Sequence, residues 1–186
     1  MKTVGILLAG GLSRRFGSPK AFAKIGDDYF YEKVHQALSA VCDEVVIVTR
    51  KELVQLFPPE LEVVTDHVAV SDKGPLAGIS TAMKLKRADR YMVLPCDMPF
   101  IGPAETRELL KLVNSKAQVT AVKTEDEKIP LFSIWAGNFS EELEQAIGDE
   151  KLSVFDFLNS LETTWIDHWL IHPNKDKFRN INRNSL

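Results

Sequence analysis

A glycine-rich loop with closely spaced cations follows the first apolar run of the chain. Residues 8–20 read LAGGLSRRFGSPK and contain three glycines, two serines and three cations. Glycines allow backbone N–H groups to approach an anion closely, and Arg and Lys side chains neutralise charge that backbone dipoles only partly offset. Because cations crowded into a bare turn would repel one another, the composition favours a phosphate-binding loop over a simple polar turn.

The spacing of these glycines differs from the two commonest phosphate-binding motifs. The loop lacks the Gly-x-Gly-x-x-Gly order of dinucleotide-binding proteins, and no Lys-Ser or Lys-Thr pair follows its last glycine as in a P-loop. The sequence also contains neither Gly-x-Ser-x-Gly nor His-Glu-x-x-His, which argues against a serine hydrolase and a zinc protease. A different type of nucleotide loop is therefore expected.

Acidic residues follow two other apolar runs. Asp97 comes shortly after residues 91–94, and Asp66 directly follows residues 61–65. Ligands of open α/β sheets collect at the carboxyl ends of strands, where a carboxylate can hold Mg²⁺ against phosphate oxygens. We therefore expect Asp97 to be a metal ligand, with Asp66 as a second acidic strand end. A turn or helix-capping role is the alternative for each, and Asp72 is an alternative to Asp66.

A second glycine motif lies at residues 74–78, which read GPLAG. Pro75 suits the first turn of a helix, whereas Gly78 falls one turn in, where helix propensity disfavours glycine. Gly78 therefore indicates a close approach, either of a nucleotide base or ribose or of the sheet beneath the helix.

Alternating apolar runs and helical patterns predict the scaffold that positions these residues. Short β-branched or aliphatic runs occur at residues 4–8, 45–48, 61–64, 91–94 and 119–122. Segments with helical spacing lie between them. This order predicts a three-layer α/β/α sandwich with a mostly parallel sheet. Further along, residues 131–136 and 163–166 are expected to be strands, and Asn138 is expected to cap a helix.

The length and composition of the chain indicate one domain spanning residues 1–186. With 23 Lys plus Arg against 26 Asp plus Glu, the net charge is −3, so a nucleic-acid partner is not expected. Two distant cysteines match no metal or redox spacing, and no apolar stretch approaches the roughly 20 residues of a membrane span. We therefore expect a cytoplasmic protein with no membrane partner.

Taken together, three motifs resemble those of the molybdenum cofactor guanylyltransferase (MobA) family. They are the loop LAGGxSxRxGxxK at residues 8–20, GPLAG at residues 74–78 and CDMP at residues 96–99. The resemblance covers nearly the whole chain and ends in residues 178–182. It implies a Rossmann-like nucleotidyltransferase fold. The implied reaction is transfer of GMP from GTP to molybdenum-loaded molybdopterin, with release of pyrophosphate, in a Mg²⁺-dependent enzyme.

The residue patterns and the resemblance together suggest roles for individual residues. Those expected to bind nucleotide are Leu8, Ala9, Gly10, Gly11, Lys20, Asp66, Gly78 and Asp97. Those expected to act in catalysis are Arg15, Lys20 and Asp97, with Asp97 as the Mg²⁺ ligand. Arg179, Asn180 and Asn182 are weaker candidates for the acceptor site. Other molybdenum cofactor assembly proteins are expected partners.

The sequence departs from the family pattern on the expected acceptor side. Ile129-Pro130 stands where His-Pro is common, and residues 182–186 lack a usual Thr-Pro continuation. Alternatives are a molybdopterin cytidylyltransferase, a sugar-phosphate nucleotidyltransferase, or a non-catalytic GTP-binding protein that delivers the pterin. Gly10 and Met98 favour guanine, because cytidylyltransferases usually carry Ala-Ala-Gly and Asp-Gln-Pro at these positions.

Overall fold

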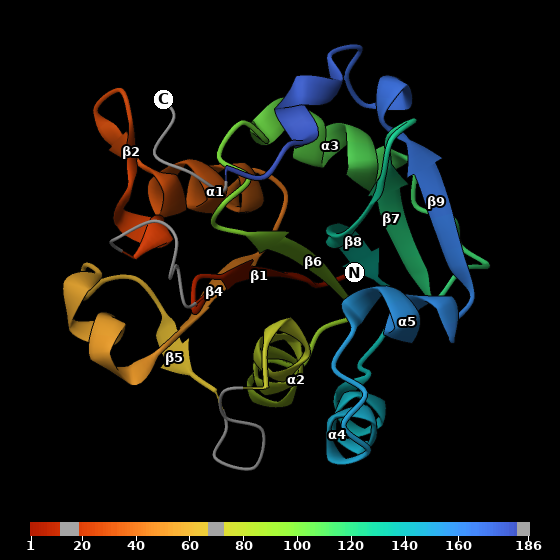
Figure 1. The fold of residues 1–186 in the computed structure, drawn as a ribbon, viewed down its shortest axis with the longest axis horizontal. Helices are drawn as coiled ribbons and strands as arrows, with labels where there is room; N and C mark the ends of the chain where they lie inside the picture. Colours follow the sequence, from red (N-terminus) through yellow and green to blue (C-terminus); the bar gives the residue numbers. More distant parts are fainter. Residues whose placement is uncertain (12–18, 67–72, 182–186) are drawn as a thin grey trace.

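A seven-stranded sheet runs through the centre of the molecule, with helices on both of its faces (Figure 1). The computed structural model describes residues 1–11, 19–66 and 73–181. The strand order is β5-β4-β1-β6-β8-β7-β9. The strands are β1 (Thr3–Leu8), β4 (Glu44–Thr49), β5 (Val63–Thr65), β6 (Arg90–Pro95), β7 (Val119–Lys123), β8 (Lys128–Trp135) and β9 (Thr163–Asp167). Only β8 among these strands runs antiparallel to its neighbours, which confirms the prediction of a mostly parallel sheet.

The helices divide between the two faces of the sheet. In Figure 1, α1 and α3 lie above the sheet, whereas α2, α4 and α5 lie below it. The helices are α1 (Phe30–Ser39), α2 (Pro75–Leu85), α3 (Pro103–Lys111), α4 (Ser140–Gly148) and α5 (Val154–Asn159). Short 3-10 helices are η1 (Lys20–Phe22), η2 (Lys51–Leu56), η4 (His168–Leu170) and η5 (Lys175–Phe178). The three layers match the predicted sandwich. None of the helices in the described residues is long and apolar enough to span a bilayer.

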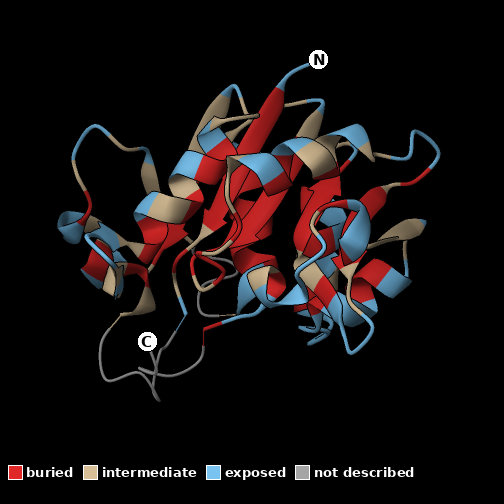
Figure 2. Ribbon diagram, turned by 90° about the horizontal axis from the view of Figure 1, so that it is seen from above, coloured by how far each residue is buried: buried red, intermediate tan, exposed pale blue. Residues whose placement is uncertain are grey.

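Alternating side chains of the strands supply two separate cores. In β1, Leu7 packs in the cluster that includes α1, whereas Val4 and Ile6 pack in the cluster that includes α2. This alternation follows from the two-residue repeat of a strand. Figure 2 shows the result, with buried strands between helices whose outer surfaces are exposed.

Helix α1 packs closely on β1 at Gly5. A Cβ at Gly5 would lie only 3.1 Å from the Cβ of Leu38 and 3.2 Å from the Sγ of Cys42. Helix α1 therefore sits tightly on the strand that leads into the glycine-rich loop.

The chain reverses its direction of strand addition at β1. After β1 it adds β4 and β5 on one side, and it then crosses back to place β6 on the other side. Leu8 consequently pairs with Val48 of β4 and with Pro95 of β6 at the carboxyl ends of the three strands. Such a switch point is where open α/β sheets bind ligands.

Some local details differ from the sequence predictions. β8 begins at Lys128, three residues before the predicted strand, because pairing with Lys123 of β7 continues past a bulge. The N-cap of α4 is Phe139 rather than Asn138. Asn138 still accepts a hydrogen bond from the Ser140 amide at 2.9 Å, while its own amide donates to the carbonyl of Met83 at 2.7 Å. Tertiary bonding to α2 therefore decides the orientation of this side chain.

Candidate active site

The glycine-rich loop leaves the sheet at the switch point. The Cys96 amide donates to the Leu8 carbonyl at 2.9 Å, and the Ala9 amide donates to the Val48 carbonyl at 2.8 Å. The Thr49 hydroxyl donates to the Ala9 carbonyl at 3.2 Å. Leu8 and Ala9 are thus held between the two flanking strands. Gly10 is the first loop residue beyond these bonds.

Protein packing in the described residues does not demand glycine at positions 10 and 11. A Cβ at Gly10 would meet its nearest neighbour at an ordinary 3.7 Å, and a Cβ at Gly11 would meet nothing within 4 Å. Neither glycine has a positive φ. Packing within the fold therefore does not explain glycine at these two positions, whereas the close approach of a ligand to the backbone would explain it.

Lys20 and Asp97 meet at the carboxyl edge of the sheet. Lys20 opens η1 after the loop, and Asp97 follows β6 by two residues. The Lys20 Nζ lies 3.1 Å from an Asp97 carboxylate oxygen, and the two side chains are 18% and 22% exposed. They are therefore shielded but still reachable by a ligand. The two residues that the sequence places 77 positions apart come together as predicted.

The carboxylate of Asp97 fits a Mg²⁺ site of the kind that substrates complete. In the described part of the chain, no group of three or more His, Cys, Asp or Glu side chains forms a metal cage. Mg²⁺ is usually held by one or two carboxylates together with substrate phosphates and water. A single accessible carboxylate next to the phosphate-type loop meets that requirement.

Asp66 lies on the β4–β5 side of the switch point, and Gly78 lies over the ends of β1 and β4. Asp66 directly follows β5, separated from β1 by β4. Gly78 is buried in α2, where a Cβ would lie 2.8 Å from the Leu8 side chain and 3.5 Å from that of Val48. The structure thus accounts for Gly78 by helix-on-sheet packing. A direct nucleotide contact by either residue stays a prediction.

The C-terminal segment returns to the carboxyl edge beside Asp97. The Ile181 amide donates to the Asp97 carbonyl at 2.8 Å. Arg179, one of the acceptor candidates, lies over the ring of Phe100 with its guanidinium carbon 5.0 Å from the ring centroid. Asn180, between Arg179 and Ile181 in the sequence, is exposed. The remaining candidates Asn182 and Arg15, and the alternative Asp72, lie outside the described residues.

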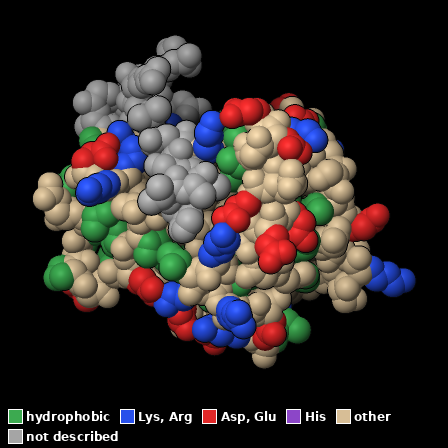
Figure 3. All heavy atoms as spheres, turned by 90° about the horizontal axis from the view of Figure 1, so that it is seen from below, with side chains coloured by type: hydrophobic (Ala, Val, Ile, Leu, Met, Phe, Trp, Pro, Cys, Tyr) green, Lys and Arg blue, Asp and Glu red, His purple; other side chains and the backbone are tan. Residues whose placement is uncertain are grey.

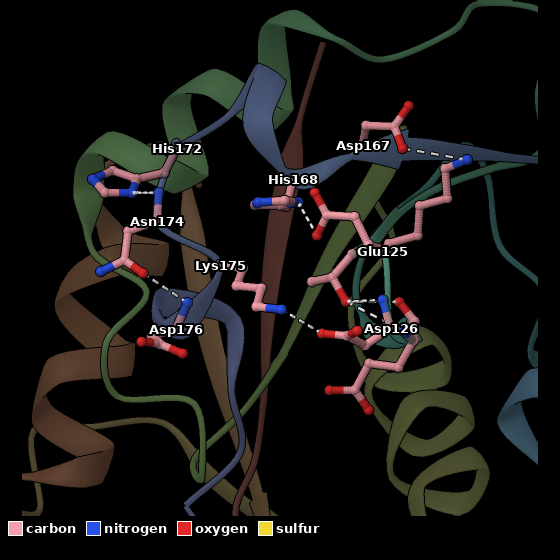
Figure 4. A network of polar contacts seen from close by, with 11 residues as sticks. Glu125, Asp126, Asp167, His168, His172, Asn174, Lys175 and Asp176 are labelled. Carbon is pink, nitrogen blue, oxygen red and sulfur yellow. Dashed lines mark hydrogen bonds and ion pairs between the residues drawn. The ribbon is translucent and has the colours of Figure 1, made fainter.

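Polar contacts fasten this segment to the turn between β7 and β8 (Figure 4). Lys175 pairs with Asp126 at 2.6 Å, and the buried His168 lies 3.7 Å from the carboxylate of Glu125. The pairing lowers the pKa of Asp126 through the Lys175 hydrogen bond. These contacts hold in place the segment that leads to Arg179 and Ile181 at the carboxyl edge of the sheet.

Arg50, which belongs to none of the sequence motifs, also lies near the loop. Arg50 directly follows β4, and its Cγ is 3.8 Å from the position that a Cβ of Gly10 would occupy. The signal that could have found it is the one used for Asp66 and Asp97, a polar residue at a strand's carboxyl end. On the face seen from below, Lys and Arg side chains lie among Asp and Glu side chains (Figure 3).

The family follows from the comparison with known sequences. The model of the MobA-like NTP transferase domain matches residues 5–164. The chain belongs to this family. This MobA-like chain is 32% identical to the probable molybdenum cofactor guanylyltransferase of Geobacillus sp. (strain WCH70), over 97% of the chain and 94% of that relative. It is 35% identical to the probable molybdenum cofactor guanylyltransferase of Bacillus subtilis (strain 168), over 98% of the chain and 91% of that relative.

A solved MobA-like structure has the same fold. The crystal structure of molybdopterin-guanine dinucleotide biosynthesis protein A from Archaeoglobus fulgidus superposes with a TM-score of 0.79. It is 25% identical in sequence, and the alignment covers 98% of this chain and 93% of that one. The MobA-like chain is therefore a nucleotidyltransferase by family and by fold.

Proposed function

We propose that this protein transfers GMP from GTP to the phosphate of molybdenum-loaded molybdopterin, forming the guanine dinucleotide cofactor and releasing pyrophosphate. The Lys20–Asp97 pair carries the proposal, because it places a cation and a carboxylate beside the glycine-rich loop at the switch point of the sheet. The names of the guanylyltransferase relatives support the choice of GTP and of the pterin acceptor.

The reaction needs charge neutralisation more than proton transfer. A phosphate monoester has a second pKa of about 6, so the acceptor is largely a dianion at neutral pH. Its oxygen attacks the α-phosphorus of GTP, and the bond between that phosphorus and the pyrophosphate oxygen breaks. No proton has to be removed, which agrees with a site built from Lys20 and Asp97 and not from a Ser-His pair.

The residues of the chain bring two anions together. Lys20 and Arg15 would neutralise phosphate charge, and the backbone of Leu8, Ala9, Gly10 and Gly11 would line the triphosphate. Asp66 would hold the nucleoside portion, and Asp97 would hold Mg²⁺. When bound, Mg²⁺ supplies Lewis-acid charge stabilisation at the phosphates. Arg179, Asn180 and Asn182 would contact the acceptor.

The proposal extends to the organisation and setting of the protein. Residues 1–186 would act as one catalytic domain, in the cytoplasm, with other molybdenum cofactor assembly proteins as partners. The negative net charge supports a protein without a nucleic-acid partner.

A pyrophosphate-release assay tests the proposal. The purified chain is given GTP, CTP, ATP or UTP, with and without Mg²⁺, and with molybdenum-loaded molybdopterin as acceptor. We expect release with GTP only when Mg²⁺ and acceptor are both present. Release with CTP would indicate a cytidylyltransferase, and GTP binding without any release would indicate a delivery protein.

A further inference from the structure

Arg50 occupies a defined position beside the glycine-rich loop. It is the first residue after β4 and the N-cap of η2, and β4 pairs directly with β1. Its Cγ lies 3.8 Å from the point that a Cβ of Gly10 would reach. The aliphatic stem of Arg50 therefore passes the first glycine of the loop, and its side chain is 25% exposed.

The Arg50 guanidinium is only partly paired in the described part of the chain. Nη1 pairs with the Glu52 carboxylate at 2.8 Å. Nε is buried and has no hydrogen-bond partner among the described residues. A buried donor without an acceptor is costly. The orphaned Nε belongs to the side-on edge of the guanidinium, where Nε and Nη2 present two parallel N–H donors.

The position of Arg50 on the β4 side of β1, away from the Lys20–Asp97 pair, favours the base of a nucleotide over its phosphates. The Lys20–Asp97 pair marks the phosphate end at the adjoining ends of β1 and β6. Arg50 lies on the opposite flank of β1, at the end of β4. Adjacent strands are about 4.8 Å apart, so two strand spacings separate β4 from β6. A nucleotide that extends over β1 from the phosphate end brings its base toward Arg50.

We propose that Arg50 determines base specificity by donating two hydrogen bonds to O6 and N7 of guanine. Guanine presents two acceptors at these positions, whereas adenine presents one acceptor and an amino donor. An arginine, which has only donors, therefore favours guanine. The inference rests on the proposed function for its choice of nucleotide. Arg50, which would recognise the base, lies outside the glycine and aspartate motifs.

Nucleotide analogues test this assignment in the full-length chain. Affinities of GTP, ITP, 7-deaza-GTP, ATP and tripolyphosphate are measured by calorimetry for wild type, Arg50→Ala and Arg50→Lys. We expect Arg50→Ala to weaken GTP and ITP, which share O6 and N7, by about 10- to 100-fold. ATP and 7-deaza-GTP should weaken much less, and tripolyphosphate should not change. Arg50→Lys should also lose the preference for GTP over 7-deaza-GTP, since an ammonium cannot replace the planar fork.

Arg87→Ala serves as the matched control, because it removes one exposed arginine that lies in sequence between α2 and β6. It should keep the wild-type ratio of GTP to 7-deaza-GTP affinity. Thermal melting confirms that each variant is folded. Equal weakening of GTP, ATP and tripolyphosphate in Arg50→Ala would assign Arg50 to the phosphates and overturn the proposal, as would unchanged affinities in both Arg50 variants.

Pyrophosphate release by the wild type, measured on the same preparations, separates this inference from the proposed function. If the wild type binds GTP without turnover and Arg50→Ala loses base discrimination, the reading of guanine by Arg50 stands while the catalytic proposal fails. If the wild type turns over and the affinity ratios of the Arg50 variants match it, the inference fails alone.

Discussion

The backbone amide of Ile181 donates a hydrogen bond to the backbone carbonyl of Asp97 at 2.8 Å. The bond joins the C-terminal segment to the turn that carries the proposed metal ligand. Because it uses main-chain atoms, substitutions of the Asp97 side chain can test chemistry without breaking this link.

Asp97→Asn should reduce the rate of pyrophosphate release at least about 100-fold, because a bound metal supplies several kcal/mol of charge stabilisation. The backbone bond to Ile181 is retained, so the melting temperature should change little. Asp149→Asn, in an exposed ion pair at the end of α4, is the matched control. A rate near that of wild type in Asp97→Asn would show that Asp97 is not the metal ligand.

Lys20→Ala should weaken GTP binding and slow transfer together, lowering kcat/KM by about 10- to 100-fold, because the ammonium meets phosphate in both the ground and transition states. Steady-state kinetics with varied GTP measure both effects. Lys24→Ala removes a nearby exposed cation that lies over the Tyr29 ring and should leave kcat/KM unchanged. Kinetic constants unaltered by Lys20→Ala would contradict the loop model.

Gly78→Ala should be more destabilising with Leu8 present than in a Leu8→Ala background. The new Cβ would lie 2.8 Å from the Leu8 side chain, and this crowding opposes the gain of about 1 kcal/mol in helix propensity. Urea unfolding of the two single variants and the double variant should give a coupling of about 1–2 kcal/mol. Additive free energies of unfolding would show that Leu8 does not impose the glycine.

Glu105→Gln should lower the free energy of unfolding at pH 7 by about 1–3 kcal/mol. Glu105 is 2% exposed and accepts hydrogen bonds from Lys177 at 2.9 Å and from the Gly102 amide at 2.8 Å. Burial by itself would raise the pKa of Glu105, but these hydrogen bonds outweigh it and hold the pKa below its ordinary value.

The pH dependence of Glu105→Gln has a definite sign. A carboxyl with a depressed folded pKa contributes stability above its unfolded pKa of about 4.3, and that stability is lost as pH falls through the folded pKa. The wild type should therefore lose stability below about pH 4.3 more steeply than Glu105→Gln. Urea unfolding between pH 3 and pH 7 measures this difference. Lys151→Ala, which removes an exposed cation at the end of α4, should leave the pH dependence of the wild type unchanged.

The fold class could be predicted because each strand and helix has its own spacing of apolar residues, which can be recognised from a short stretch of sequence. The apolar runs that became β1, β4 and β6 have both faces covered, so they read as continuous hydrophobic segments. The orientation of Asn138 could not be predicted, since it depends on the Met83 carbonyl from a distant helix. The short hairpin of β2 (Lys24–Ile25) and β3 (Asp28–Tyr29) was also missed, because two-residue strands leave no periodic pattern.

Part of the candidate site, the pairing of Lys20 with Asp97, could also be predicted from the sequence. The convergence of Lys20 and Asp97 follows from strand ends that meet at a switch point, which sequence order alone can indicate. Arg50 was missed because a single arginine after a strand is common, and only its orphaned Nε beside Gly10 sets it apart. Whether Gly78 serves packing or ligand contact required the distance to Leu8.

Because β8 runs in the reverse direction, two separate parts of the chain form the carboxyl edge of the sheet. Because β8 runs against β6, the strand enters at that edge through Lys128 and not through its far end. Under the proposed function, the residues that bind GTP all lie before residue 100, whereas the acceptor residues come from the C-terminal segment beside the β7–β8 turn. On the same proposal, exchanging residues 124–127 and 175–181 would alter recognition of the acceptor and leave the residues proposed for GTP unchanged.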